Sequence, residues 1–185
     1  IAVPGGVRPV EDLQPGDLVM TRDDGPQPVR WTGQRRVAAN GNMAPVHIAA
    51  GALGDHGPLV LSPQHRVMLR DGLAELLFGE PEVLVAAKHL VNDRTIRRVP
   101  GGEVTYVHVM FDRHQILVSE GLETESFLPG PEAAGALDGP VTEEILGLFP
   151  ELDPATGAGY GPAARRTLKS YEARLLKAAS STEAA

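Results

Sequence analysis

The chain has 185 residues, contains no cysteine and carries a formal net charge of −7 at pH 7. This length corresponds to one domain with appendages, and a hydrophobic content of 42% is sufficient for a buried core. The acidic balance gives no long-range attraction to nucleic acid or to an anionic membrane, and no apolar run is long enough to span a bilayer. Without cysteine, these residues can form no disulfide, no thiolate metal site and no cysteine-based catalytic centre.

Short apolar runs separated by turns rich in Gly and Pro predict an all-β domain over residues 1–129. A strand at residues 18–21, a hairpin loop ending in Asp24-Gly25 and a returning strand at residues 28–32 come first. Further strands are predicted at residues 45–49, 59–62, 66–69, 106–111 and 115–118, with a helical turn at residues 74–78 and a chain reversal at Glu120-Gly121.

A weak internal repeat relates residues 10–19 to residues 87–96. Each segment has an apolar residue, two polar residues, a leucine, a three-residue connection and then a strand. At this offset of 77 residues, Leu13 matches Leu90 and Gly25 matches Gly102. The repeat predicts two β-subdomains related by an internal pseudo-twofold axis.

The tail at residues 130–185 is rich in Gly, Pro and Ala, and it contains two helix signals. Thr142 and the acidic residues after it predict a short helix at about 142–149, which Pro150 ends. Pro162 suits the first position of a second helix at about 162–178. The apolar stripe of this second helix packs on the β domain or docks a partner, and it consists of Ala164, Leu168, Tyr171 and Leu175.

Histidines are the first candidates for chemistry near neutral pH, and the chain has six. No pair has the helical spacing of metal ligands, so no metal site is predicted. His65 follows a strand in the turn Ser62-Pro63-Gln64-His65, where the Ser62 hydroxyl can orient the imidazole. The plainer interpretation of this pattern is a turn with a partly exposed histidine.

Two further patterns leave alternatives open. Asp112 stands two residues before His114. This segment either pairs a carboxylate with an imidazole or forms a surface turn in which Asp112 binds Arg113. Ser62 could be the nucleophile of a hydrolase, but the glycine pattern of a nucleophile elbow is missing around it.

Taken in order, four segments resemble the Hint domains of hedgehog C-terminal regions and inteins, and they are closest to the bacterial intein-like branch. The resemblance covers about residues 1–129 and implies a compact Hint-type β fold. The short C-terminal helices would follow this fold. The four segments are Val-Glu-Asp-Leu-Gln-Pro-Gly-Asp-Leu-Val at residues 10–19, Ser-Pro-Gln-His at 62–65, residues 83–96, and residues 104–109 with 114–122.

The resemblance implies self-processing, in which the domain cleaves the polypeptide attached to its own N-terminal side. A Cys or Ser at the first position of the domain attacks the preceding peptide bond and converts the amide into an ester. Carried over, His65 protonates the departing amine, Ser62 orients the scissile peptide and His114 assists resolution of the ester. His108 stands where inteins often have Asp, while Asp112 is assigned only by its adjacency to His114. No cofactor is implied.

The sequence departs from the family pattern in two places. The nucleophile belongs a short stretch before Ile1, so the 185 residues by themselves are expected to be inactive. The His-Asn pair that ends inteins has no counterpart at residues 120–127, so we expect cleavage or transfer to an outside nucleophile rather than splicing.

The departures leave two alternatives open. One is a degenerate Hint domain that serves as a binding or structural module, and the other is an unrelated hydrolase that uses Ser62, His65 or Asp112. The self-processing interpretation requires the His65 imidazole to lie near Ile1 and near His114. Export is suggested by analogy with the family, whose domains often occur in large secreted bacterial proteins.

Overall fold

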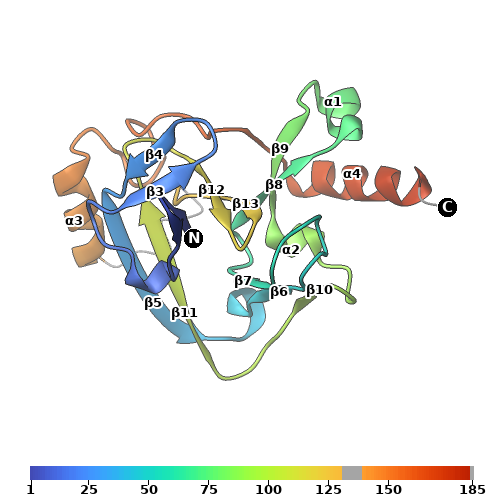
Figure 1. Cartoon of the computed structure of the whole chain (residues 1–185), viewed down its shortest axis with the longest axis horizontal. Helices are drawn as coiled ribbons and strands as arrows, with labels where there is room; N and C mark the ends of the chain where they lie inside the picture. Colours follow the sequence, from blue (N-terminus) through green and yellow to red (C-terminus); the bar gives the residue numbers. More distant parts are fainter. Residues whose placement is uncertain (131–138, 184–185) are drawn as a thin grey trace. The chain divides into compact units, whose positions relative to one another are not determined.

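The computed structural model describes residues 1–130 and 139–183 (Figure 1). The chain divides into two units, each assembled from three separate stretches. The first unit consists of Ile1–Val37, Thr105–Ser119 and Glu125–Ala164, and the second of Ala38–Val104, Glu120–Thr124 and Arg165–Ala185. The sequence predicts a different division, into residues 1–129 and 130–185. The tail contributes residues to both units, and the predicted domain boundary near residue 129 stays a prediction.

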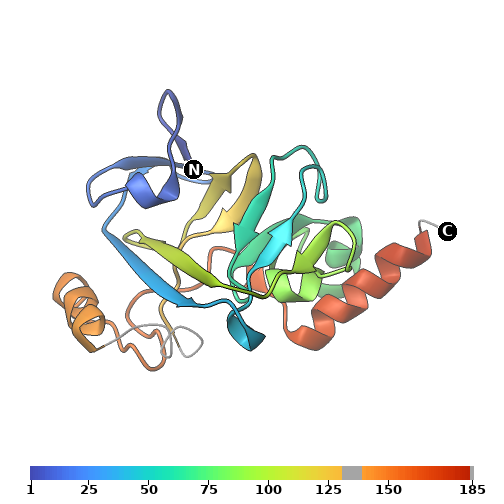
Figure 2. The same cartoon turned by 90° about the horizontal axis from the view of Figure 1, so that it is seen from below.

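Antiparallel strands and one terminal helix build the first unit. Strands β12, β3 and β4 are hydrogen-bonded in that order, while β5 pairs with β11 as two long strands (Figure 2) and β1 pairs with β2. The elements are β1 (Ala2–Val3), β2 (Gly6–Val7), the 3-10 helix η1 (Val10–Asp12), β3 (Leu18–Thr21), β4 (Gly25–Pro28), β5 (Trp31–Ala38), β11 (Glu103–Met110), β12 (Ile116–Ser119) and α3 (Gly139–Leu148).

The predicted hairpin at residues 18–32 is confirmed, but its second strand is divided. β3 and β4 pair in register from Leu18↔Pro28 to Thr21↔Gly25. The chain then changes partners, because the main-chain N–H of Arg30 donates to Met110 O over 2.8 Å. The predicted strand at residues 28–32 therefore spans the point where the chain leaves β3 and joins β11.

The end of β11 contributes to two separate core clusters of the first unit. Alternate residues of a strand point to opposite faces, so Val109 and Phe111 enter one cluster and Met110 enters the other. The first cluster also contains Leu13, Val19, Val29 and Leu117. The second combines Met110 with Trp31 and with the tail residues Ile145, Leu152 and Tyr160.

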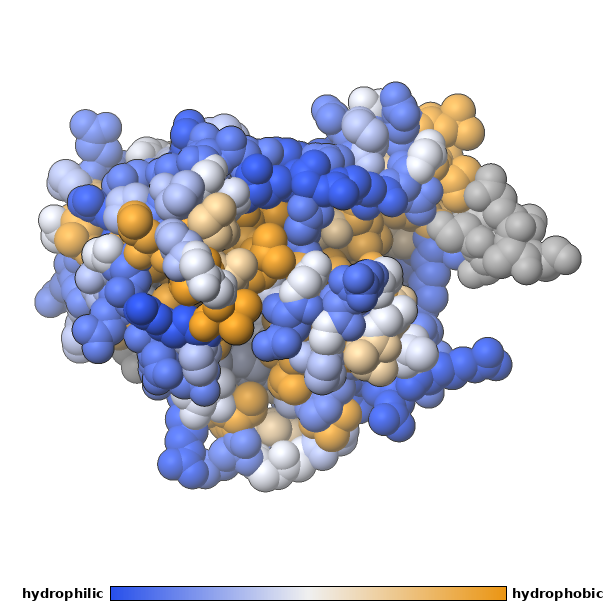
Figure 3. All heavy atoms as spheres, in the orientation of Figure 1, coloured by the Kyte–Doolittle hydropathy of each residue, from blue (hydrophilic) through white to orange (hydrophobic). Residues whose placement is uncertain are grey.

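Two groups of hydrogen-bonded strands form the second unit, in the orders β10-β6-β7 and β14-β9-β8-β13. Helix α1 begins at an Asp71 cap and ends at Gly79 in the left-handed conformation. In Figure 3, hydrophobic atoms lie over α1, where Leu76 is 79% exposed. The elements are η2 (Gly41–Met43), β6 (Val46–Ile48), β7 (Leu59–Leu61), β8 (Arg66–Arg70), α1 (Gly72–Phe78), β9 (Glu82–Ala86), α2 (Ala87–Leu90), β10 (Ile96–Arg98), β13 (Leu122–Glu125), β14 (Arg166–Thr167) and α4 (Ser170–Glu183).

The C-terminal helices differ from those predicted. α3 begins at Gly139 rather than Thr142, because Pro140 starts it. The predicted helix at 162–178 begins only at Ser170, since residues 166–167 form β14, which pairs in parallel with β9. The late start also changes the buried face: Ala173 and Leu176 pack in the core, whereas Tyr171 and Leu175 are 60% and 50% exposed.

The two halves of the sequence repeat fall in different units. Residues 10–12 form η1 before β3, and residues 87–90 form α2 before β10, so each apolar-x-x-Leu segment makes one helical turn followed by a strand. The pseudo-twofold axis itself stays a prediction. The predicted β fold with C-terminal helices is confirmed.

Candidate functional site

The Ser62-Pro63-Gln64-His65 segment is a tight turn between β7 and β8 in the second unit. The main-chain N–H of His65 donates to the Ser62 carbonyl over 3.1 Å and lies 3.2 Å from Ser62 Oγ. Ser62 therefore fixes the backbone of the turn that carries the imidazole. The Ser62 hydroxyl thus faces the main-chain N–H of His65. Its predicted role in orienting the imidazole stays a prediction.

Helix α2 ties this turn in place. The N–H of Ala87 donates to His65 O over 2.9 Å, and the N–H of Lys88 donates to Pro63 O over 3.0 Å. The Lys88 ammonium also reaches Gln64 Oε1 over 2.6 Å. These donors belong to the first turn of α2, where main-chain N–H groups have no partner within the helix. Two of the four family-like segments are thus one hydrogen-bonded structure, and it holds His65 with its Nε2 atom buried.

His114 lies in the first unit, two residues before β12, and its side chain is 0% exposed. The N–H of Ala164 donates to His114 Nδ1 over 2.9 Å, and Nε2 lies 3.2 Å from Oε2 of Glu125. A ring nitrogen that accepts a hydrogen bond carries no proton, so the proton of the neutral ring is on Nε2 and is donated to Glu125. This assignment follows from the hydrogen-bond partners.

The residues next to this pair are also buried and polar. The N–H of Gln115 donates to Ser126 Oγ over 2.9 Å, and the N–H of Ser126 donates to Gln115 O over 2.9 Å. The Gln115 side-chain amide donates to Asp24 Oδ2 over 2.9 Å. Gln115, Glu125 and Ser126 are 2%, 7% and 2% exposed, so this part of the unit holds a satisfied polar network rather than an apolar core.

Glu125 was missed by the sequence analysis. In the segment at 120–127, the sequence predicts a chain reversal at Glu120-Gly121 and lacks a His-Asn pair, but it assigns no role to Glu125. The available signal was an acidic residue in an otherwise strand-like segment, but a residue of that type on a strand faces solvent more often than the interior.

Asp112 does not supply the carboxylate of His114. Its side chain is 66% exposed and lies 3.2 Å from Arg30, while Arg113 pairs with Asp24 at 2.7 Å. Asp112 and Arg113 form an exposed bend, as the second alternative predicts, but the ion-pair partner of Asp112 is Arg30 rather than Arg113.

His108 packs its ring edge-on against Phe127, with 5.0 Å between the ring centroids. His108 is partly buried on β11, three residues before Phe111. This contact shows where His108 sits, but it gives no proton-transfer role.

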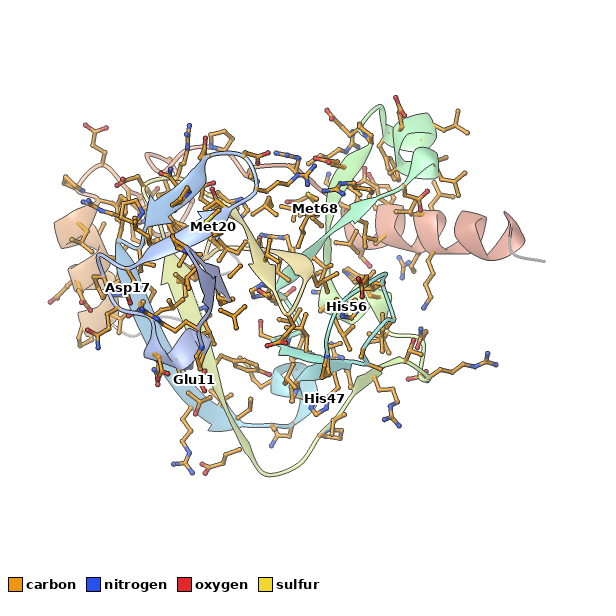
Figure 4. All side chains as sticks on the ribbon, in the orientation of Figure 1. Glu11, Asp17, Met20, His47, His56 and Met68 are labelled. Carbon is orange, nitrogen blue, oxygen red and sulfur yellow. The ribbon has the colours of Figure 1, made fainter. Side chains whose placement is uncertain are left out.

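Two other histidines lie in the second unit and are labelled in Figure 4. His47 is on β6, and His56 is on the loop after it. Leu53 N–H donates to His56 Nε2 over 3.0 Å, and Nδ1 faces the carbonyl of Gly57, so both ring nitrogens of His56 bind its own loop. His56 is therefore a structural residue.

Over residues 1–130 and 139–183, no three His, Asp or Glu side chains come together in a way that could hold a metal ion. Within the same ranges, no helix is long and apolar enough to cross a membrane.

The described units separate the predicted site residues. Ser62 and His65 belong to the second unit, whereas His108, Asp112 and His114 belong to the first. The approach of His65 to Ile1 and to His114 stays a prediction.

The protein-family model of the Hint domain matches residues 1–131. No curated protein and no solved structure matches the chain significantly. Ser62, His65, His114 and Glu125 lie inside the matched region, while Ala164 lies outside it.

Proposed function

This chain belongs to the Hint-domain family of self-processing domains, and we propose that it cleaves the peptide bond through which a flanking polypeptide enters the domain. The observation that carries the proposal is the turn at residues 62–65. Ser62 and the two N–H groups of α2 hold it at three points, so the histidine at its end is presented on a fixed support. General acid catalysis requires such a fixed position.

The proposed reaction begins with a cysteine placed before Ile1. Its thiolate attacks the carbonyl carbon of the preceding peptide bond, the carbon–sulfur bond forms and the carbon–nitrogen bond breaks. The departing amine takes a proton from His65. In the second step an outside nucleophile displaces the sulfur and gives its proton to Nδ1 of His114, where the proton replaces the hydrogen bond from the Ala164 N–H, and the thiolate is released with the domain.

The entry of the chain into the first unit supports this proposal. The nitrogen of Ile1 donates to Arg8 O over 2.8 Å, and the N–H of Arg8 donates to Ile1 O over 2.9 Å. Ile1 and Val3 also pack against the core cluster that contains Phe111, three residues before His114. A residue placed before Ile1 is therefore joined to an anchored strand, as a positioned nucleophile must be.

One observation favours the degenerate Hint domain as a second candidate. The His114 side chain is 0% exposed and both of its ring nitrogens are bonded, an arrangement that suits a purely structural histidine as well. The two candidates differ in whether a fusion protein with an installed nucleophile releases its flank.

The test is a fusion protein in which a small reporter and a short segment carrying Cys precede Ile1. We expect release of the reporter, acceleration by thiol or hydroxylamine, and loss of release in His65→Ala. His47→Ala is the matched control and should cleave like the parent. A folded fusion that stays intact with both reagents contradicts self-processing and supports the structural module.

A further inference from the structure

We infer that Glu125 is a positioning residue of the self-processing site and acts through His114. Glu125 and the main-chain N–H of Ala164 hold the His114 ring from its two nitrogens, and we call this pair of contacts the clamp. The inference rests on the proposed function, since it concerns the histidine that resolves the ester. It adds a carboxylate that the sequence analysis did not consider and a backbone group from outside the family-matched residues 1–131.

The clamp determines the orientation of the ring. His114 Nε2 lies 3.2 Å from Glu125 Oε2, while Nδ1 accepts from Ala164 N–H over 2.9 Å. Rotating the imidazole by half a turn would replace a nitrogen by a carbon at both partners. Because the ring is buried, water cannot substitute for either partner, so the two bonds select one orientation and one tautomer.

Glu125 is suited to more than holding the ring. Its side chain is 8% exposed, and a buried carboxylate is stable only when it is paired and hydrogen-bonded. When Nδ1 of His114 takes the proton of the outside nucleophile, the bond from the Ala164 N–H opens, the ring becomes a cation, and the carboxylate on Nε2 stabilises that charge at short range. An amide in the same place accepts the same hydrogen bond but carries no charge.

A hydrogen bond four residues before Ala164 anchors this part of the tail. The Tyr160 hydroxyl donates to Phe111 O over 2.7 Å, in a buried position. The first-unit core therefore fixes the segment that brings the Ala164 N–H to the histidine. The clamp therefore joins three parts of the first unit: the segment between β11 and β12, Glu125 as the last residue of β13, and the tail.

The direct test of the clamp is the tautomer of His114 in the 185-residue chain, measured by ¹H–¹⁵N NMR of the imidazole. The expected result is a proton on Nε2 and none on Nδ1 near neutral pH. A proton on Nδ1 would overturn the inference, because the Ala164 N–H could not then donate to that atom. This measurement does not depend on any processing.

The functional test uses Glu125→Gln and Glu125→Leu in the cleaving fusion. Hydroxylamine release reports the thioester formed in the first step, and unaided release reports its resolution. We expect hydroxylamine release like that of the parent, with resolution slowed about tenfold by Gln and about 100-fold by Leu. Glu123→Gln, which changes a partly exposed carboxylate two residues away, should leave both rates unchanged.

The outcomes separate the two claims. A parent fusion that forms no thioester rejects the proposed function, and the NMR result then decides the clamp by itself. A parent fusion that cleaves, with Glu125→Gln equal to it in both steps, rejects the positioning role of the carboxylate. If Glu125→Leu fails to fold, Glu125→Gln still gives a decision because it preserves the shape and the hydrogen bond.

Discussion

The hydroxyl of Tyr160 donates to the carbonyl oxygen of Phe111 over 2.7 Å, although 49 residues separate them in sequence. The bond joins the tail to the chain directly after β11, three residues before His114. The same stretch of tail passes close to other backbone, since a Cβ at Gly157 or Gly159 would meet the carbonyl of Pro129 or Glu151. This stretch of the Gly-, Pro- and Ala-rich tail is therefore a shaped part of the first unit.

Tyr160→Phe removes the donor and leaves the buried Phe111 carbonyl without this partner. We expect the free energy of unfolding at pH 7 to fall by about 1–3 kcal/mol, measured by urea denaturation. Tyr171→Phe is the control, because Tyr171 is 60% exposed and should change the stability by less than about 0.5 kcal/mol. Equal stabilities for the two variants would show that the bond contributes nothing.

The same tyrosine predicts a pH dependence in alkali. Burial raises the pKa of Tyr160 above its usual value of 10. The neutral phenol is thus favoured in the folded state. Its contribution is complete below pH 10 and is lost as the unfolded tyrosine ionises at higher pH. The stability difference between parent and Tyr160→Phe should therefore shrink above pH 10, and a constant difference would contradict this explanation.

At Glu82 we expect stability to depend on pH in the acid range, with the opposite sign. Burial opposes ionisation of this carboxyl, but hydrogen bonds from Arg165 and Arg70 outweigh it and hold its pKa below the usual 4.5. Stability from the charged form is present above pH 4.5 and is lost as the pH falls through the lowered pKa. Glu82→Gln should cost up to about 1 kcal/mol at pH 7 and nothing once the parent carboxyl is protonated. Thermal melts of both proteins across the acid range measure this, and parallel curves would reject it.

The absence of a side chain at Gly33 leaves room for the indole of Trp31, the only tryptophan of the sequence. The indole of Trp31 lies where a Cβ of residue 33 would be, so Gly33→Ala must displace a ring that is 2% exposed. We expect a loss of about 1–3 kcal/mol and a red-shifted tryptophan emission. Gly147→Ala in α3 meets no atom and should be neutral or stabilising by up to about 1 kcal/mol. An unchanged emission in Gly33→Ala would show that the indole does not occupy this place.

His56 provides a test of structural against chemical histidines. His56→Ala removes both anchors of its loop and should lower the stability by about 1–3 kcal/mol. In the cleaving fusion it should nevertheless release the reporter at a temperature where it remains folded. Loss of release in folded His56→Ala, with His65→Ala still active, would reverse the assignment of these two residues.

Local signals explain what the sequence could predict. Asp24-Gly25 and Glu120-Gly121 predict chain reversals because the turns need positive φ, and Gly25, Glu120 and Gly121 have φ of 66°, 50° and 87°. The Ser62–His65 turn is local in the same way.

Long-range contacts explain what the sequence could not predict. The change of strand partner at Arg30 requires its hydrogen bond to Met110, and β14 forms because it pairs with the edge of β9. The partners of His114 are Glu125, 11 residues away, and Ala164, 50 residues away. Both partners lie in other segments of the chain than His114, and the periodicity within one helix or strand gives no indication of a contact between segments.

The mass of the polypeptide released from the cysteine-bearing fusion by hydroxylamine tests self-processing most directly. If the domain forms a thioester at that cysteine, the flank is released with a C-terminal hydroxamate, and the product is absent from His65→Ala but present in His47→Ala. An intact fusion, or a flank released with an ordinary carboxylate in equal amounts from parent and His65→Ala, would contradict the proposed function.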